Sequence, residues 1–142
     1  MNGVRLSGVK HMNSRLEKVI NHPLHKQLGI SCIESREGCG HFSIRVSESS
    51  LNPAGALHGG VIYLLCDVCA YAGLLSLIDE QTEAVTHDIQ VSVMRSAKLG
   101  DKVHFDSNVV RLGKRICFIE IVATIGNNVI ATAKVTKSMI SA

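Results

Sequence analysis

The sequence is poor in aromatic residues. Tryptophan is absent, and aromatic residues make up only 4% of the 142 residues. Proteins that bind single-stranded nucleic acids stack the bases on aromatic side chains, and this chain has few to offer. Its formal net charge of +3 is only mildly basic and does not by itself indicate a nucleic-acid partner. We therefore expect that the protein binds no nucleic acid.

The chain also lacks the features that divide a protein into separate parts. It contains no linker, internal repeat or low-complexity run, and its 142 residues suffice for one domain with one core. Hydrophobic residues make up 46% and charged residues 19%, which is typical of a globular protein and not of a disordered chain. We predict a single domain over residues 1–142.

The cysteines do not follow the pattern of a disulfide framework or a metal site. Their number, five, is odd and their spacing is irregular. Cys66 and Cys69 form a CxxC pair, but no second pair and no paired histidine follows at zinc-binding spacing. Because the pair lies inside a long apolar segment, we interpret both residues as small core residues. We expect no metal and no cofactor.

No segment is typical of secretion or of membrane insertion. The first ten residues lack the apolar part of a signal peptide, which predicts a reducing, cytoplasmic setting. The longest apolar segment, 61–78, approaches the length of a membrane-spanning helix. Its central Asp67 would be costly in lipid, and no flanking basic cluster marks an inner face. We predict a helix buried in a soluble core, and no membrane partner.

Hydrophobic periodicity predicts two helices and six strands. Helical spacing indicates a short amphipathic helix at 10–21, followed by Pro23, and the long helix at 61–78. Alternation and turn residues predict strands at 27–34, 41–46, 84–94, 102–112, 115–125 and 129–139. One sheet with one helix on one face is an α+β fold. A sheet wrapped around that helix would explain why the helix is apolar almost all round.

The sequence also predicts one turn and the faces of one strand. Gly38 and Gly40 are interpreted as a turn between the first two strands. In the strand 84–94, simple alternation places Ile89 and Val91 on one face and Thr86 on the other.

The segment from Asn52 to Gly60 and the helix after it carry the features that indicate chemistry. Gly59 and Gly60 stand at the start of the long helix, where a ligand can come close to the backbone. The first N–H groups of a helix have no internal partner, so they can stabilise an oxyanion that develops on a bound carbonyl. Asp67 is the only acid in the apolar run, and a carboxylate in such surroundings needs a role or a partner.

The spacing of Gly59 and Asp67 constrains how they work together. Eight residues of α-helix separate the two positions by about 12 Å. A catalytic carboxylate has to come within about 3 Å of its target or of a water molecule. If both residues serve one substrate, they come from two chains. We therefore expect a homodimer with antiparallel central helices and two equivalent sites.

This pattern resembles the PaaI-like branch (4-hydroxybenzoyl-CoA thioesterase type) of the hotdog-fold thioesterase superfamily. The resemblance covers residues from about 27 to 138 and depends on the HGG run at 58–60, Asn52 before it, Asp67 after it, and the segment 95–101 with its Lys-Leu-Gly-Asp turn. It implies an antiparallel sheet wrapped around one long helix, and hydrolysis of acyl-CoA or related pantetheine thioesters. It also implies a homo-oligomer, commonly a tetramer built as a dimer of dimers.

The resemblance assigns roles to individual residues. Gly59 would donate its N–H to the thioester carbonyl, and Asp67 of the other subunit would act as general base or nucleophile. Asn52 would position the attacking water or the thioester, and Thr86 matches a Ser or Thr near that water. His58 is expected to order the loop beside the substrate, next to Gly60.

Each of these residues also has a purely structural alternative. Asn52 could form a turn, the glycines could permit close helix packing, and Asp67 could be a paired buried acid. Thr86 could be an ordinary strand residue. The conjunction of all four features favours the site.

The two ends of an acyl-CoA substrate, its nucleotide and its acyl group, would lie in different places. The nucleotide phosphates of CoA would meet Arg111, Lys114 and Arg115 on the surface. The acyl group would enter the subunit interface beside helix residues Leu64, Leu65 and Val68.

Two other functions stay open at this point. The first is a non-catalytic module that binds acyl-CoA, although the residues before the first strand are too few for a DNA-binding helix-turn-helix. The second is a hotdog dehydratase, whose D-x-N-P-x-H pattern is matched at Asn52-Pro53. Position 50 is Ser where that pattern needs Asp, and position 55 is Gly where it needs His.

Overall fold

The structure is a computed structural model and describes residues 13–142. Its first elements are two short helices, α2 (Arg15–Ile20) and α3 (Pro23–Gln27). The expected helix at 10–21 corresponds to α2, and residues 10–12 lie outside the described residues. The expected strand at 27–34 is wrong at its start, because residues 23–27 are helical and β1 begins at Ser31. Proline at a first helical position starts a helix readily, and the ring of His22 caps α3 by accepting the Leu24 N–H at 3.2 Å.

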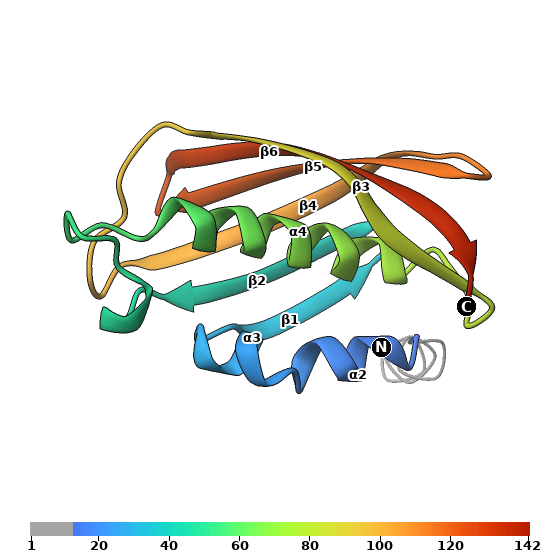
Figure 1. The fold of residues 1–142 in the computed structure, drawn as a ribbon, viewed down its shortest axis with the longest axis horizontal. Helices are drawn as coiled ribbons and strands as arrows, with labels where there is room; N and C mark the ends of the chain where they lie inside the picture. Colours follow the sequence, from blue (N-terminus) through green and yellow to red (C-terminus); the bar gives the residue numbers. More distant parts are fainter. Residues whose placement is uncertain (1–12) are drawn as a thin grey trace.

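Six antiparallel strands form one sheet in the order β1-β2-β4-β5-β6-β3 (Figure 1). Their bounds are β1 (Ser31–Arg36), β2 (Cys39–Arg45), β3 (Thr82–Val93), β4 (Lys102–Leu112), β5 (Ile116–Ile125) and β6 (Asn128–Ser141). The prediction was exact for β4 and for the end of β5, and it differed by one or two residues at the start of β5 and at both ends of β3 and β6. β3 hydrogen-bonds to β6 and forms one edge of the sheet, so one side of its backbone is unpaired within residues 13–142.

The long apolar helix α4 (Gly59–Leu75) lies across the inner face of this sheet (Figure 1). Ten of its 17 residues are buried, which confirms the predicted central helix and the α+β hotdog architecture. It starts two residues earlier and ends three residues earlier than predicted. Among the described residues, no helix is long and apolar enough to cross a membrane.

The helix packs on β2 with almost no space between the two backbones. A Cβ on Gly73 of α4 would lie 2.8 Å from the Gly40 nitrogen, and a Cβ on Gly40 would lie 2.7 Å from the Gly73 nitrogen. Gly40 therefore belongs to strand β2 and permits close packing, so its interpretation as a turn residue was wrong. Gly38, with φ +79°, does lie in the turn between β1 and β2.

The core lies between α4 and the sheet. Phe42 and Phe105 stack there with ring centroids 5.3 Å apart. Cys66 and Cys69 are also fully buried, and burial raises the pKa of each thiol to about 12. These two residues are core residues, as predicted.

Candidate active site

The loop before α4 is ordered by Asn52. Its side-chain oxygen accepts the N–H groups of Ala54 at 2.9 Å and Ala56 at 3.0 Å. Its backbone N–H donates to the Ala56 carbonyl at 2.7 Å, and Gly55 adopts the positive φ that the turn needs. Asn52 thus forms the turn that was the structural alternative to a role in the site, and only its amide NH₂ is left for a bound molecule.

His58 caps the start of α4 and satisfies most of its first N–H groups. The His58 ring accepts the Gly60 N–H at 3.1 Å, and its carbonyl accepts the N–H groups of Val61 and Ile62 at 3.0 and 3.1 Å. Within residues 13–142 the N–H of Gly59 has no acceptor. A Cβ on Gly59 would meet only the Tyr63 hydroxyl, at 4.0 Å. Gly59 is half-buried, and its unpaired N–H can bind a carbonyl oxygen.

Asp67 holds the centre of a three-residue network. Its Oδ1 accepts a hydrogen bond from the Thr86 hydroxyl at 2.7 Å and lies 3.0 Å from Lys137 Nζ. Lys137 Nζ also donates to Thr86 Oγ1 at 2.9 Å. The Lys137 side chain is 4% exposed, whereas that of Asp67 is 35% exposed. Thr86 and Lys137 therefore hold one oxygen of the carboxylate in place, while part of the Asp67 side chain remains exposed.

A bulge in β3 brings Thr86 to this network. Thr86 lies opposite Lys137, and Asp88 opposite Thr136, so the extra residue His87 interrupts the pairing. Beyond the bulge, Ile89 pairs with a buried residue of β6. Directly paired side chains share a face, so Thr86 and Ile89 both face the helix. Simple alternation had placed them on opposite faces and was wrong.

Lys137 was not among the predicted site residues. Its signal was the alternation of β6, where Lys137 continues the buried face formed by Ala131, Ala133 and Val135. A lysine at such a position needs a carboxylate partner.

An open cavity of about 370 Å³ adjoins Asp67 and Lys137. Its wall from α4 includes Leu64, Val68 and Tyr71, and residues of α2 and α3 close the opposite side. Two of the three predicted acyl-contacting residues line this cavity. Leu65 does not, because its side chain is fully buried in the core, so its assignment was wrong.

A second polar cluster bounds the cavity. The Arg15 guanidinium lies 2.8 Å from Glu83 Oε1, and the Tyr71 hydroxyl donates to the same oxygen at 2.9 Å. Burial alone would raise the pKa of Glu83, but hydrogen bonds from the Ala84 N–H, Arg15 and Tyr71 lower it below its ordinary value. Burial and the bond to Glu83 raise the pKa of Tyr71 to about 12. The cavity thus has two paired acids, Glu83 with Arg15 and Tyr71, and Asp67 with Lys137 and Thr86.

The structure does not bring all predicted residues together within one chain. Gly59 and Asp67 lie on the same continuous helix, about 12 Å apart along its axis. Arg111, Lys114 and Arg115 are exposed on the β4–β5 hairpin, which lies at the end of the molecule away from the start of α4 (Figure 1).

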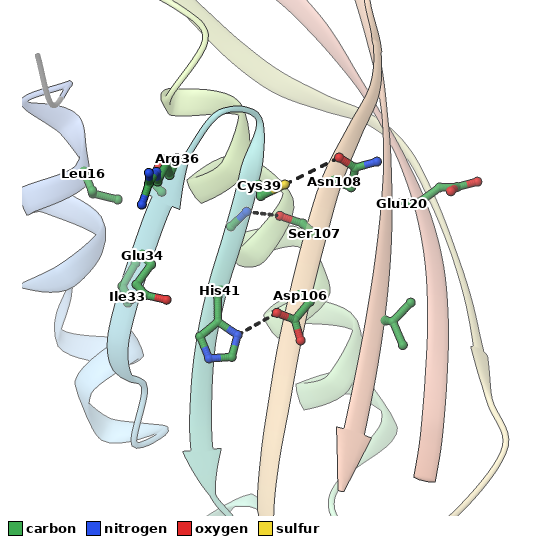
Figure 2. A pocket seen from close by; sticks show the side chains of 13 residues that line it. Leu16, Ile33, Glu34, Arg36, Cys39, His41, Asp106, Ser107, Asn108 and Glu120 are labelled. Carbon is green, nitrogen blue, oxygen red and sulfur yellow. Dashed lines mark hydrogen bonds and ion pairs between the residues drawn. The ribbon is translucent and has the colours of Figure 1, made fainter. Parts of the chain in front are cut away.

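A larger hollow of about 710 Å³ lies elsewhere, over β1, β2 and β4 (Figure 2). In it, His41 Nδ1 lies 2.7 Å from Asp106 Oδ1, and Cys39 Sγ lies 3.6 Å from the side-chain oxygen of Asn108. None of the predicted site residues lines it. The candidate site is therefore the smaller cavity beside Asp67.

Comparison with known proteins identifies the family of the chain. A family model described as the thioesterase superfamily matches residues 54–132, more than half of the chain. A putative esterase of Archaeoglobus fulgidus is 30% identical over 117 residues, which cover 82% of this chain and 74% of that protein. Human acyl-coenzyme A thioesterase 13 is 27% identical over 92 residues, and the match covers 65% of each chain.

Solved structures show the same fold. A Streptococcus mutans protein, smu.793, bound to acetyl CoA is 25% identical, with a TM-score of 0.73 over 80% of this chain and 90% of that one. The phenylacetic acid degradation protein PaaI of Thermus thermophilus is 20% identical, with a TM-score of 0.76 over 82% of this chain and 97% of that one. With its sheet wrapped around one helix and its HGG loop, the chain belongs to the thioesterase superfamily and has the hotdog fold of the PaaI-like thioesterases.

Proposed function

We propose that the protein hydrolyses acyl-CoA or related pantetheine thioesters to a free acid and a thiol. The observation that supports this most directly is the Asp67 carboxylate, held by Thr86 and Lys137 at 2.7 and 3.0 Å while its accessible side borders a cavity. The smu.793 neighbour binds acetyl CoA, and the human relative is named an acyl-coenzyme A thioesterase. Both agree with this substrate class.

The active unit is a homodimer in which each site takes Gly59 from one chain and Asp67 from the other. The separation of about 12 Å on one helix prevents both groups of one chain from reaching the same thioester. Two features support a partner chain here. Gly60, Tyr63 and Asp67 lie on a stripe of α4 that the sheet does not bury, and β3 offers an unpaired edge. By family resemblance, two such dimers form a tetramer.

The chemistry needs one donor and one carboxylate. The Gly59 N–H polarises the thioester carbonyl and stabilises the oxyanion that forms when the carbonyl carbon is attacked. With Asp67 as general base, a water molecule gives its proton to the carboxylate as its oxygen bonds to carbon. The C–S bond then breaks, and the thiolate takes up the proton. If Asp67 attacks directly, the thiolate leaves first and water hydrolyses the resulting anhydride.

The other predicted residues support this step. The Asn52 amide donates to the water or to the thioester, Thr86 orients the carboxylate, and His58 and Gly60 shape the loop beside the substrate. Arg111, Lys114 and Arg115 reach the CoA phosphates from the surface of a neighbouring chain.

The first test is release of free thiol from a panel of aliphatic and aromatic acyl-CoAs. We expect hydrolysis by the wild type, and none above background by Asp67→Ala with the oligomer intact. Asp106→Asn is the matched control, because this exposed acid lies outside the cavity and pairs with His41. Tight binding without hydrolysis of any substrate would favour a binding module. Faster interconversion of 3-hydroxyacyl and enoyl thioesters would favour a dehydratase.

A second test addresses the shared site. Asp67→Ala and Gly59→Pro chains are each expected to be inactive alone. Refolded together, they form heterodimers with one intact site, and activity should return. If activity does not return although heterodimers form, both groups act within one chain and the dimeric site is wrong.

A further inference from the structure

We propose that Lys137 is a positioning residue for the reaction. It holds the Asp67 carboxylate so that Oδ1 is occupied and Oδ2 faces the substrate. This inference depends on the proposed function, since it concerns the same carboxylate.

The contacts of Lys137 are directed at Asp67. Its Nζ lies 3.0 Å from Asp67 Oδ1 and 2.9 Å from Thr86 Oγ1, and the Thr86 hydroxyl donates to the same Oδ1. The ammonium also lies 5.5 Å from the centre of the Tyr71 ring. The remaining acid of this cavity, Glu83, is bound by Arg15 and Tyr71. Lys137 is thus paired with one carboxylate, on one oxygen.

Packing gives no reason for a lysine at this position. Its neighbours on the inner face of β6, Ala131, Ala133 and Val135, are apolar, and the Lys137 side chain is 4% exposed. Burying an ammonium group is costly unless it is paired and hydrogen-bonded, and an apolar side chain of similar length would fill the space without that cost. Unlike methionine, lysine at position 137 donates to the Asp67 carboxylate and can therefore fix its orientation.

The consequence is orientation. An aspartate on a helix can rotate about two side-chain bonds, and only some rotamers direct an oxygen into the cavity. Two donors on Oδ1 select one of them and leave Oδ2 for the attacking water or the thioester carbon. A displacement of about 1 Å in a catalytic group can cost a hundredfold in rate.

The test compares steady-state kinetics of Lys137→Met with those of Lys134→Met. Lys134 is on the same strand and carries the same charge, but it is exposed on the outer face of the sheet. We expect Lys137→Met to lower kcat by about a hundredfold with KM nearly unchanged, and Lys134→Met to change neither. A folded Lys137→Met enzyme with the wild-type kcat would overturn the proposal. A matched loss in Lys134→Met would overturn it as well, because the effect would then be one of general charge.

Lys137→Arg keeps the experiment informative if the methionine variant does not fold. It retains a cation with N–H donors, and the adjoining cavity of about 370 Å³ gives the larger group room. We expect it to fold and to recover most of kcat. A folded arginine variant that is as slow as Asp67→Ala would contradict the positioning role. If instead Asp67→Ala is as active as the wild type, the proposed function itself fails.

Discussion

The ring of His58 accepts the Gly60 N–H at 3.1 Å, and this bond determines which donor of α4 is available to a substrate. The His58 carbonyl takes the N–H groups of Val61 and Ile62, so the Gly59 N–H remains without an acceptor in the described chain. Within residues 13–142, the first turn of α4 thus has one free backbone donor, the N–H of Gly59, and Gly59 has no side chain that would hinder a substrate.

Replacing Gly59 by proline should remove this donor without harming the helix. Proline suits a first helical position, and His58 already has the extended backbone (φ −61°, ψ 132°) that a residue before proline prefers. We expect Gly59→Pro to melt at or above the wild-type temperature and to lose about 10²–10³-fold in kcat. Gly59→Ala, which keeps the N–H, is the control and should lose less. Equal activities of the two variants would show that the N–H does not contribute.

The cap itself can be tested by stability. His58→Ala removes the acceptor for the Gly60 N–H, and loss of a helix cap typically costs about 1 kcal/mol. We expect urea denaturation to show a lower free energy of unfolding for His58→Ala. His58→Asn, which supplies another capping oxygen, should stay near the wild-type value. Equal losses in both variants would mean that the ring contributes by packing and not by capping.

The contact between α4 and β2 predicts a sensitive position. A Cβ on Gly73 would lie 2.7 Å from Ser107 Oγ as well as 2.8 Å from the Gly40 nitrogen, so helix and sheet would have to separate. We expect Gly73→Ala to lower the free energy of unfolding by about 1–3 kcal/mol. Gly60→Ala, in the first turn of the same helix, is the control: its Cβ would lie 3.4 Å from Nδ1 of the His58 ring, an ordinary contact, and should cost little. An unchanged melting temperature for Gly73→Ala would contradict this packing.

Thiol reactivity should follow burial. Cys32 and Cys39 are exposed, whereas Cys66, Cys69 and Cys117 are buried, and burial raises the pKa of all three buried thiols. Because the thiolate is the reactive form, iodoacetamide should modify two cysteines in the native protein and five after unfolding. Peptide mass spectrometry identifies the sites. Modification of Cys66 in the native protein at neutral pH would contradict the core assignment.

Tyr71 predicts a loss of stability at high pH. Its folded pKa of about 12 lies above the ordinary value of 10, so the folded state binds its proton more tightly. The stabilisation is fully present below pH 10 and is lost as the pH rises from 10 to about 12. Tyr71→Phe has no proton to lose there, so its free energy of unfolding should fall less steeply over this range. Parallel curves for the two proteins would exclude Tyr71 as the cause.

Sequence reasoning was most reliable where a local signal controls the structure. The apolar run predicted α4, and the glycine-containing turns predicted the hairpins of β4, β5 and β6 to within two residues. It failed where structure depends on partners that are distant in sequence. The β3 bulge at His87 follows from pairing with β6, and Gly40 has its role because Gly73 packs against it.

The site residues, too, could be predicted where the signal is local and were missed where it depends on residues distant in sequence. The HGG run and Asp67 could be found because a few adjacent residues carry a recognisable chemistry. Lys137 lies 70 residues after Asp67, and its role depends on a strand pairing that no local pattern reveals. Arg15 and Glu83 were missed for the same reason, because their ion pair joins α2 to the start of β3.

The position of β3 affects the order in which the protein can be completed during synthesis. Within the sheet of residues 13–142, β6 is the sole neighbour of β3, and β6 is made last of the six strands. At ribosomal rates, the interval between the synthesis of β3 and that of β6 lasts on the order of seconds. During this interval β3 has no strand of its own chain to pair with. The Lys137 contact to Asp67 cannot form before β6 is made, and Thr86 is held in place by its pairing with Lys137. A nascent chain can therefore assemble most of its core around α4 while Asp67 still lacks its contact with Lys137.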